Sequence, residues 1–182
     1  EAVGASRMVA DLALEPHLLA SIRNLNLLTL KPVLWAYNVN DQDVKDQGSD
    51  PFTIACKIEQ EIMELDSDDE RRAYLKELGL SASGLDRMNH AVYDALGLMS
   101  FYTMGEDEAR AWTVTKGSTA PIAAGKIHSD IQRGFIRAEI IRFDDLVAAG
   151  SEAAVREQGK VSQRGKDYIL QDGDICHFKF NV

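Results

Sequence analysis

Long hydrophobic runs are missing from this sequence. The longest apolar stretches, such as residues 32–37, have the length of a strand, whereas a helix that crosses a membrane needs about 20 apolar residues. We therefore expect no membrane segment. The sequence begins without a basic and then apolar leader, so we expect no secretion. Only two cysteines are present, Cys56 and Cys176, and neither stands in a motif, which predicts reduced, buried thiols in a cytoplasmic protein.

Basic charge is also scarce. The net charge is −9, and residues 1–97 hold nine Lys and Arg against 17 Asp and Glu, while residues 98–182 hold 11 against 12. A domain dominated by nucleic-acid binding would be strongly basic, so any RNA contact must use a local patch. The four histidines lie at no zinc-like spacing from cysteine or acidic residues, and no metal site is expected from this chain.

Residues 1–97 show the succession of strand and helix that is typical of an α/β fold. A helix is expected from about residue 17. The bulky apolar run at 32–37 predicts a strand that is buried on both faces, as in a parallel sheet, and residues 51–56 predict a second short strand. Helical periodicity then covers residues 57–65, 67–79 and 83–97, the middle segment opening on an S-x-x-E capping box.

Residues 98–181 have a different rhythm, with many short strands. Strands are predicted at residues 100–104, 109–115, 136–140, 168–170 and 176–180, and helices at 119–134 and 143–149. Between residues 136 and 140 polar and apolar residues alternate cleanly, as in a half-buried strand. Trp112, Tyr168 and Phe178 are expected to pack in the core, and His128 to pack on the sheet. Two strands, a helix and further strands indicate an α+β domain of the β-grasp, ubiquitin-like type.

The sequence has no loop for binding phosphate groups. Such a loop reads G-x-x-x-x-G-K-[ST], because its backbone N–H groups and lysine hold the phosphates. Three Gly-Lys pairs occur, but the position of the first glycine is taken by Ala120, Ala154 and Lys160. We therefore expect no ATP hydrolysis by this chain alone, and no residue is assigned a catalytic role.

Several motifs together resemble one protein family. Residues 119–139 read TAPIAAGKIHSDIQRGFIRAE, residues 110–113 read RAWT, residues 165–174 read GKDYILQDGD, and residues 27–32 read LLTLKP. This set is similar to the YchF (Obg-like) family of P-loop ATPases, whose members carry a TGS domain. Each motif alone is weak, but their combination along nearly the whole chain is specific.

The resemblance implies a domain organisation and a parent activity. Residues 1–97 would be the C-terminal part of an Obg-type nucleotide-binding domain with the end of its helical insertion, an α/β remnant of a P-loop NTPase. Residues 98–181 would be the TGS domain with a β-grasp fold. The parent protein would hydrolyse ATP with Mg²⁺, with GTP as the alternative, and would associate with ribosomes in the cytoplasm. This chain alone would bind neither the nucleotide nor Mg²⁺.

The resemblance also implies a site for the purine base. Related GTPases read guanine with Asn-Lys-x-Asp, and the YchF family usually carries Asn-x-x-Glu. Here Asn38, Val39 and Asp41 hold these positions, just after the predicted strand, where ligands bind in open α/β sheets. Ala55 and Cys56 match the segment whose backbone packs under the base. Taken without the resemblance, the Asn and Asp are better explained by an Asx turn.

A local basic stretch predicts contact with ribosomal RNA. Lys126, Arg133 and Arg137 are its candidate residues, because cations neutralise phosphates, although a solvated polar face explains them equally well. Two other functions stay open at this point. One is a non-catalytic TGS adaptor that binds RNA or protein, and the other is a TGS domain from a threonyl-tRNA synthetase or (p)ppGpp synthetase, which the motif at 38–41 argues against.

Overall fold

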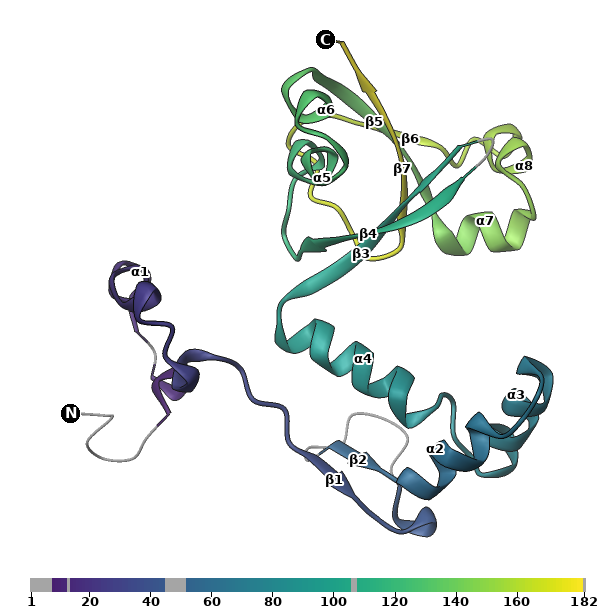
Figure 1. The fold of residues 1–182 in the computed structure, drawn as a ribbon. Helices are drawn as coiled ribbons and strands as arrows, with labels where there is room; N and C mark the ends of the chain where they lie inside the picture. Colours follow the sequence, from purple (N-terminus) through teal and green to yellow (C-terminus); the bar gives the residue numbers. More distant parts are fainter. Residues whose placement is uncertain (1–7, 13, 45–51, 106–107, 182) are drawn as a thin grey trace. The chain divides into compact units, whose positions relative to one another are not determined.

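The computed structural model describes residues 8–12, 14–44, 52–105 and 108–181 (Figure 1). The chain divides into two compact units, Glu1–Leu96 and Gly97–Val182. None of the helices within these described stretches has both the length and the apolar character that crossing a bilayer requires. Each unit is described by itself below.

The first unit opens with short helical segments. The helix predicted from residue 17 is confirmed as α1, which begins one residue earlier because Pro16 stands at its first position, where a missing N–H costs nothing. Three 3-10 turns flank it: η1 (Val9–Asp11), η2 (Arg23–Leu25) and η3 (Leu28–Leu30). The bounds of α1 are Pro16–Ile22.

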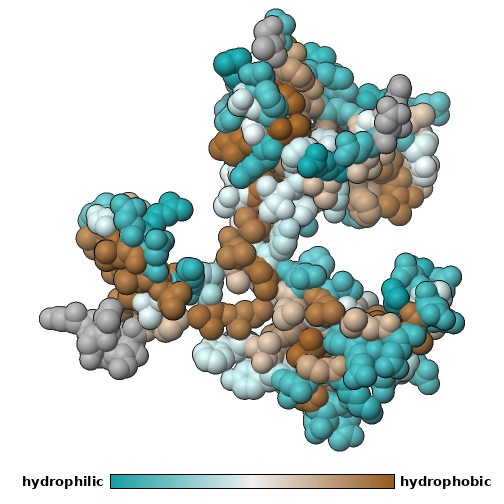
Figure 2. All heavy atoms as spheres, viewed as in Figure 1, coloured by the Kyte–Doolittle hydropathy of each residue, from teal (hydrophilic) through white to brown (hydrophobic). Residues whose placement is uncertain are grey.

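Two short parallel strands follow, β1 (Ala36–Asn38) and β2 (Phe52–Ile54). The second strand is confirmed but is shorter than the predicted 51–56, because Cys56 already begins α2. The prediction for the first is wrong in length and burial. All three residues of β1 are exposed, and the Trp35 and Tyr37 side chains are 69% and 51% exposed. Among the described residues β1 pairs only with β2, and two strands cannot cover both faces. Figure 2 shows hydrophobic side chains at the surface along the segment that leads into β1.

Three helices complete the first unit, α2 (Cys56–Met63), α3 (Asp68–Glu77) and α4 (Gly84–Ala95). The segments at 67–79 and 83–97 contain α3 and α4 as predicted, and α2 begins one residue before the predicted segment at 57–65. The apolar faces of α2 and α3 supply most of a small core made of Ala55, Ile58, Ile62 and Leu75. This core holds the start of α2 against α3, which fixes the end of β2 in place.

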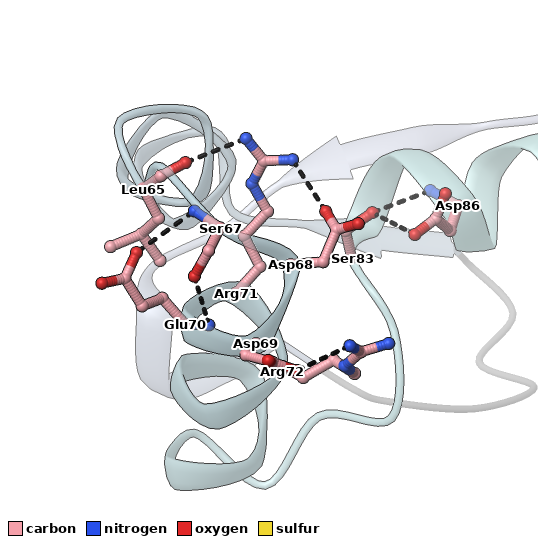
Figure 3. Close-up of polar contacts among 9 residues, drawn as sticks. All are labelled: Leu65, Ser67, Asp68, Asp69, Glu70, Arg71, Arg72, Ser83 and Asp86. Atoms are coloured by element: carbon pink, nitrogen blue, oxygen red, sulfur yellow. Dashed lines mark hydrogen bonds and ion pairs between the residues drawn. The ribbon is translucent and has the colours of Figure 1, made fainter.

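The predicted capping box at the start of α3 is confirmed (Figure 3). The Ser67 Oγ accepts a hydrogen bond from the Glu70 backbone at 3.2 Å, and the Glu70 Oε2 accepts one from the Ser67 backbone at 3.2 Å. Arg71 donates to the Leu65 carbonyl at 2.9 Å, which ties the preceding loop to the helix. Gly79, at φ +72°, follows the end of α3, in the left-handed conformation that glycine adopts most readily.

The described residues of the second unit form a mixed five-stranded sheet in the order β4-β3-β7-β5-β6. β3 runs parallel to β7, and the other neighbours are antiparallel. The strands are β3 (Leu98–Met104), β4 (Ala109–Thr115), β5 (Phe135–Arg142), β6 (Ser162–Arg164) and β7 (Asp174–Phe180). Four helices flank them: α5 (Ala120–Ile127), α6 (Ser129–Arg133), α7 (Phe143–Ala149) and α8 (Glu152–Glu157).

Helices cover both faces of this sheet (Figure 1). On one face α5 packs through its alanines onto Phe101, Ala138 and Cys176. On the other face Ile141 and Ile175 pack with Val155 of α8 and partly buried residues of α7. Trp112, Tyr168 and Phe178 lie against the first of these cores as predicted.

The single helix predicted at 119–134 is wrong, because the structure has two helices there. His128 has an extended backbone, φ −160° and ψ 143°, which separates α5 from α6. Its side chain is 63% exposed and does not pack on the sheet, because its Nδ1 accepts a hydrogen bond from the Asp130 backbone at 3.2 Å. This local cap takes the place of the expected packing contact.

Two strand predictions are also corrected. The clean alternation expected at 136–140 fails at Ile136, which is 53% exposed, because the pairing of β5 with β7 shifts register between Phe135 and Arg137. The strand expected at 168–170 is only an isolated bridge, Thr119 to Ile169.

The strand β6 was not predicted, since its residues are polar. The helix at 143–149 is confirmed with the predicted bounds.

Candidate functional site

The carboxyl ends of β1 and β2 lie side by side. The two strands are parallel, and Asn38 pairs with Ile54, so the residues that follow each strand meet at one edge. One further backbone hydrogen bond, from Val39 N to the Ile54 carbonyl at 2.9 Å, extends the pairing. The segments that contain the predicted base-binding residues are therefore adjacent, at the edge where open α/β sheets bind ligands.

The Asn38 side chain connects these two segments. Its Oδ1 accepts a hydrogen bond from the Cys56 backbone N–H at 3.1 Å. Cys56 is the first residue of α2, where backbone N–H groups have no partner inside the helix. An Asx turn would bond the backbone two residues further along, whereas Asn38 bonds a residue 18 positions away. This contact holds its side chain at the site and leaves the amide NH₂ as a donor.

Asp41 begins the turn η4 (Asp41–Asp43) and forms an ion pair with Lys57. Its Oδ2 lies 3.1 Å from the Lys57 Nζ, which is also 3.7 Å from the Glu61 Oε1. The hydrogen bond to Asp41 and the charges of both acids raise the pKa of Lys57 above its usual 10.5. Asp41 stays 41% exposed, so its carboxylate keeps capacity to accept further hydrogen bonds.

Sequence reasoning missed the residues that support Asp41. Lys57 lies one turn before Glu61 on α2 and pairs with it, and Glu61 accepts a short hydrogen bond from the Tyr74 hydroxyl. That bond, with burial, raises the pKa of Tyr74 to about 12. The i, i+4 spacing of Lys57 and Glu61 was a readable signal for a pair on one helix face. The contact of Lys57 with Asp41 was not readable, because it depends on how the two strands pair.

The other three predicted residues differ in exposure. Ala55 is buried at 2% exposure, so only its backbone faces the site, and Val39 is half-buried. Cys56 is exposed, which corrects the prediction that both thiols are buried. The reason is positional: Ile58 and Ile62 occupy the core face of α2, and Cys56 stands at the open first turn. Cys176 is buried as predicted.

The site has the groups for recognising a purine edge. Adenine presents an amino donor beside a ring acceptor, which match the Asp41 carboxylate and the Asn38 NH₂. Guanine presents two donors, which one carboxylate can accept. Within the described residues no group of three or more His, Cys, Asp and Glu side chains is arranged to hold a metal ion.

The three cations predicted to contact RNA do not form one surface. Lys126 is in the last turn of α5, and Arg133 is in α6, where it forms an ion pair with Asp130 at 2.7 Å. Arg137 is in β5 next to Ala138, which is buried beneath α5. Successive side chains of a strand point to opposite faces, so Arg137 lies on the face away from α5 and α6.

Comparison with known proteins shows what the chain is similar to. Residues 98–181 match the family YchF-GTPase_C, described as a protein of unknown function (DUF933). The chain is 44% identical to the ribosome-binding ATPase YchF of Bacillus subtilis (strain 168) over 177 residues, which are 88% of the chain and 48% of that protein. It is 42% identical to the ribosome-binding ATPase YchF of Escherichia coli O157:H7, covering 96% of the chain and 52% of that protein.

A solved structure gives the same result for the fold. The Schizosaccharomyces pombe YchF GTPase aligns with a TM-score of 0.76 and 30% identity, covering 97% of this chain and 50% of that one. The class is thus an α/β protein of the kind found in YchF GTPase structures. Over most of its length the chain is similar to YchF proteins, and residues 98–181 match the C-terminal domain model of that family. It spans about half the length of the curated relatives it matches.

Proposed function

We propose that this chain is the C-terminal portion of a ribosome-associated Obg-like ATPase. In this proposal residues 1–97 complete a nucleotide-binding domain by supplying the pocket for the base. Residues 98–181 are a TGS domain that docks on the ribosome, and the protein works in the cytoplasm. The relatives named as ribosome-binding ATPases support both the activity and the partner.

The observation that carries the nucleotide role is the contact between Asn38 and Cys56. A surface asparagine in a simple turn would have no reason to bond the start of a helix 18 residues away. The contact fixes the loop after β1 against the loop after β2, which is what a base pocket needs in order to be pre-formed. Asn38, Val39 and Asp41 would face the base edge, and the backbone of Ala55 and Cys56 would lie under the ring.

ATP is the proposed nucleotide, with GTP as the alternative. The Asp41 carboxylate can accept from the adenine amino group while the Asn38 NH₂ donates to a ring nitrogen. Asp41 has the shorter side chain that guanine-reading sites use, which keeps GTP in second place. Mg²⁺ would bind with the phosphates, for which this sequence has no G-x-x-x-x-G-K-[ST] loop. The phosphate half of the site is therefore assigned to residues encoded before Glu1.

The second unit suits a docking domain. Its antiparallel pair β3–β4, the helix α5 that follows, and the strands β5 and β7 support the proposed β-grasp arrangement of a TGS domain. Of the three cations that the sequence suggested for RNA contact, Lys126 and Arg133 lie on the face that carries α5 and α6, and Arg137 lies on the other face.

Three measurements test the proposal in sequence. The codons upstream of Glu1 are read first, and a phosphate-binding loop is expected there. Next, the isolated chain is expected to show no ATP turnover above background, and the protein extended through that loop is expected to hydrolyse ATP. Binding of a fluorescent ATP analogue to the extended protein should then weaken on Asn38→Ala. The absence of any such loop would leave a non-catalytic adaptor that binds RNA or protein as the remaining function.

A further inference from the structure

The sheet face that carries Arg137 holds three cations around one carboxylate. Arg137 of β5 lies directly opposite Lys179 of β7 in the antiparallel register, so the two side chains share a face. Glu139 is two residues further along β5 and points the same way. Its Oε2 is 3.4 Å from the Arg156 Nη2 and 3.9 Å from the Lys179 Nζ. All four residues therefore gather on the α8 side of the sheet.

This arrangement leaves positive charge in excess. Like charges directly opposite each other on neighbouring strands destabilise a sheet. Glu139 is the one carboxylate in contact with Arg156 and Lys179 among the described residues, and its side chain is only 13% exposed. Lys179 and Arg156 are 48% and 47% exposed. Arg137 is exposed and has no polar partner in the described part of the chain. Three cations and one acid give a surplus of two positive charges toward solvent.

A mainly polar pocket adjoins the cluster. It is shallow and is lined by Glu139, Arg156, Gly159, Val161 and Gln163. The neighbouring acid Glu152 is already engaged by His177 at 2.7 Å. Protein partners bind chiefly through buried aromatic or aliphatic anchors, whereas the four residues of the cluster are all charged. Nucleic-acid backbones are bound by cations and polar groups without such anchors.

We propose that Arg137, Lys179 and Arg156 form a binding surface for the phosphate backbone of RNA. The surface lies on the sheet face that carries α7 and α8. An RNA phosphate would neutralise the Arg137–Lys179 pair that otherwise costs stability. The inference rests on the proposed ribosome association and specifies its docking face. Lys126 and Arg133, on the face that carries α5 and α6, lie outside this surface.

Two double variants of the full chain provide a matched test. Arg137→Gln with Lys179→Gln removes two positive charges from the proposed surface, and Lys126→Gln with Arg133→Gln removes two from the opposite face. Both variants therefore have the same net charge. Binding is measured with a fluorescein-labelled uridine 20-mer over a series of salt concentrations, and by co-sedimentation with purified ribosomes. Thermal unfolding followed by circular dichroism checks the fold of each variant.

The first variant is expected to bind RNA more weakly with a smaller salt dependence. The slope of log K against log salt is negative, and each lost contact to a single-stranded phosphate reduces its magnitude by about 0.7. Two lost contacts reduce it by about 1.4. At 0.1 M salt this corresponds to a loss of affinity of about 25-fold if the affinities converge at 1 M. The second variant should keep the slope. Because the like-charged pair is gone, the first variant should melt at or above the wild-type temperature.

Each contrary result has a distinct meaning. An equal loss in both variants shows a net-charge effect and overturns the assigned surface. Wild-type co-sedimentation that neither variant reduces also overturns it, while ribosome association itself stands. If the wild-type chain binds ribosomes but not the uridine 20-mer, and the first variant loses ribosome binding, the partner is an acidic protein and the RNA assignment is overturned. If the wild-type chain binds neither probe, the proposed ribosome docking fails as well. Should the first variant melt early, Lys179→Gln alone is expected to give half of the slope change.

Discussion

The side-chain oxygen of Asn38 accepts a hydrogen bond from the backbone nitrogen of Cys56 at 3.1 Å. It thereby joins the end of one strand to the first residue of a helix that follows the next strand. A side chain in this position both stabilises the first unit and presents its amide NH₂ at the strand ends. The first two predictions concern this corner of the molecule.

Asn38→Ala should destabilise the first unit and weaken nucleotide binding. Loss of one hydrogen bond of this kind costs about 1 kcal/mol, which corresponds to roughly a fivefold change in an equilibrium constant. Urea unfolding of the chain measures the first effect, and binding of a fluorescent ATP analogue to the protein that carries the phosphate loop measures the second. Asn40→Ala is the control, since Asn40 bonds only Asp43, at 3.4 Å, among the contacts resolved for it. Equal effects of the two variants would contradict the role of Asn38.

Asp41→Glu should shift base preference toward ATP. The added methylene extends the carboxylate to the reach that the Asn-x-x-Glu form of the family has, and it leaves the charge that pairs with Lys57. We expect a several-fold rise in the ratio of ATP to GTP affinity, measured by competition against a fluorescent nucleotide. Asp43→Glu makes the same chemical change in the same turn η4 and should leave the ratio unchanged. A ratio that moves in both variants, or in neither, argues against Asp41 as the base reader.

The two cysteines should react at very different rates. Cys56 is exposed, whereas Cys176 is 1% exposed, and burial raises the pKa of its thiol well above the usual range, which suppresses the reactive thiolate. Iodoacetamide at pH 8 should add one label to the native chain and two in urea, as counted by mass spectrometry. Cys56→Ser should abolish the native label. A native label found on Cys176 would show that the β5–β7 core opens readily.

Stability of the second unit should fall at high pH through Tyr168. Its hydroxyl donates to the buried Asp174 carboxylate at 2.9 Å, and burial followed by this bond raises the pKa of Tyr168 to about 12 from the usual 10. The unfolded chain therefore loses the phenol proton first. The stabilisation is complete below pH 10 and is lost as the pH rises toward 12. Urea unfolding of wild type and Tyr168→Phe at pH 8, 10 and 11 should show the smaller decline in the variant, and parallel declines would exclude Tyr168 as the source.

Ser67→Ala should loosen the first turn of α3. The Ser67 Oγ accepts from the Glu70 backbone at 3.2 Å, as half of the capping box, and loss of such a cap costs about 1 kcal/mol. Thermal unfolding followed by circular dichroism measures the change. Ser67→Thr keeps the hydroxyl and should retain most of the stability. An alanine variant as stable as wild type would mean that Arg71, through the Leu65 carbonyl, holds the turn by itself.

Elements that depend on neighbouring residues were predicted well. The capping box at residues 67–70 and the helix at 143–149 form as expected, and the strand predicted at 51–56 forms over 52–54, because caps, periodicity and chain turns act over a few residues. The strand predicted at 32–37 was expected to be buried and is exposed, because the residues that cover a strand come from distant parts of the chain. The helix at 119–134 failed at His128, where a side chain-to-backbone bond outweighed the helical pattern.

The sequence by itself determined the family, the presence of Asn38 and Asp41 after a strand, and the absence of a phosphate loop. Only the tertiary structure decided which groups face one another. It brought Lys57 to Asp41, exposed Cys56, and set Arg137 against Lys179 on a face that Arg133 does not share. The physical reason is that strand register and sheet face are fixed by contacts between distant segments, and shifting one strand by a single residue would move every side chain to the other face.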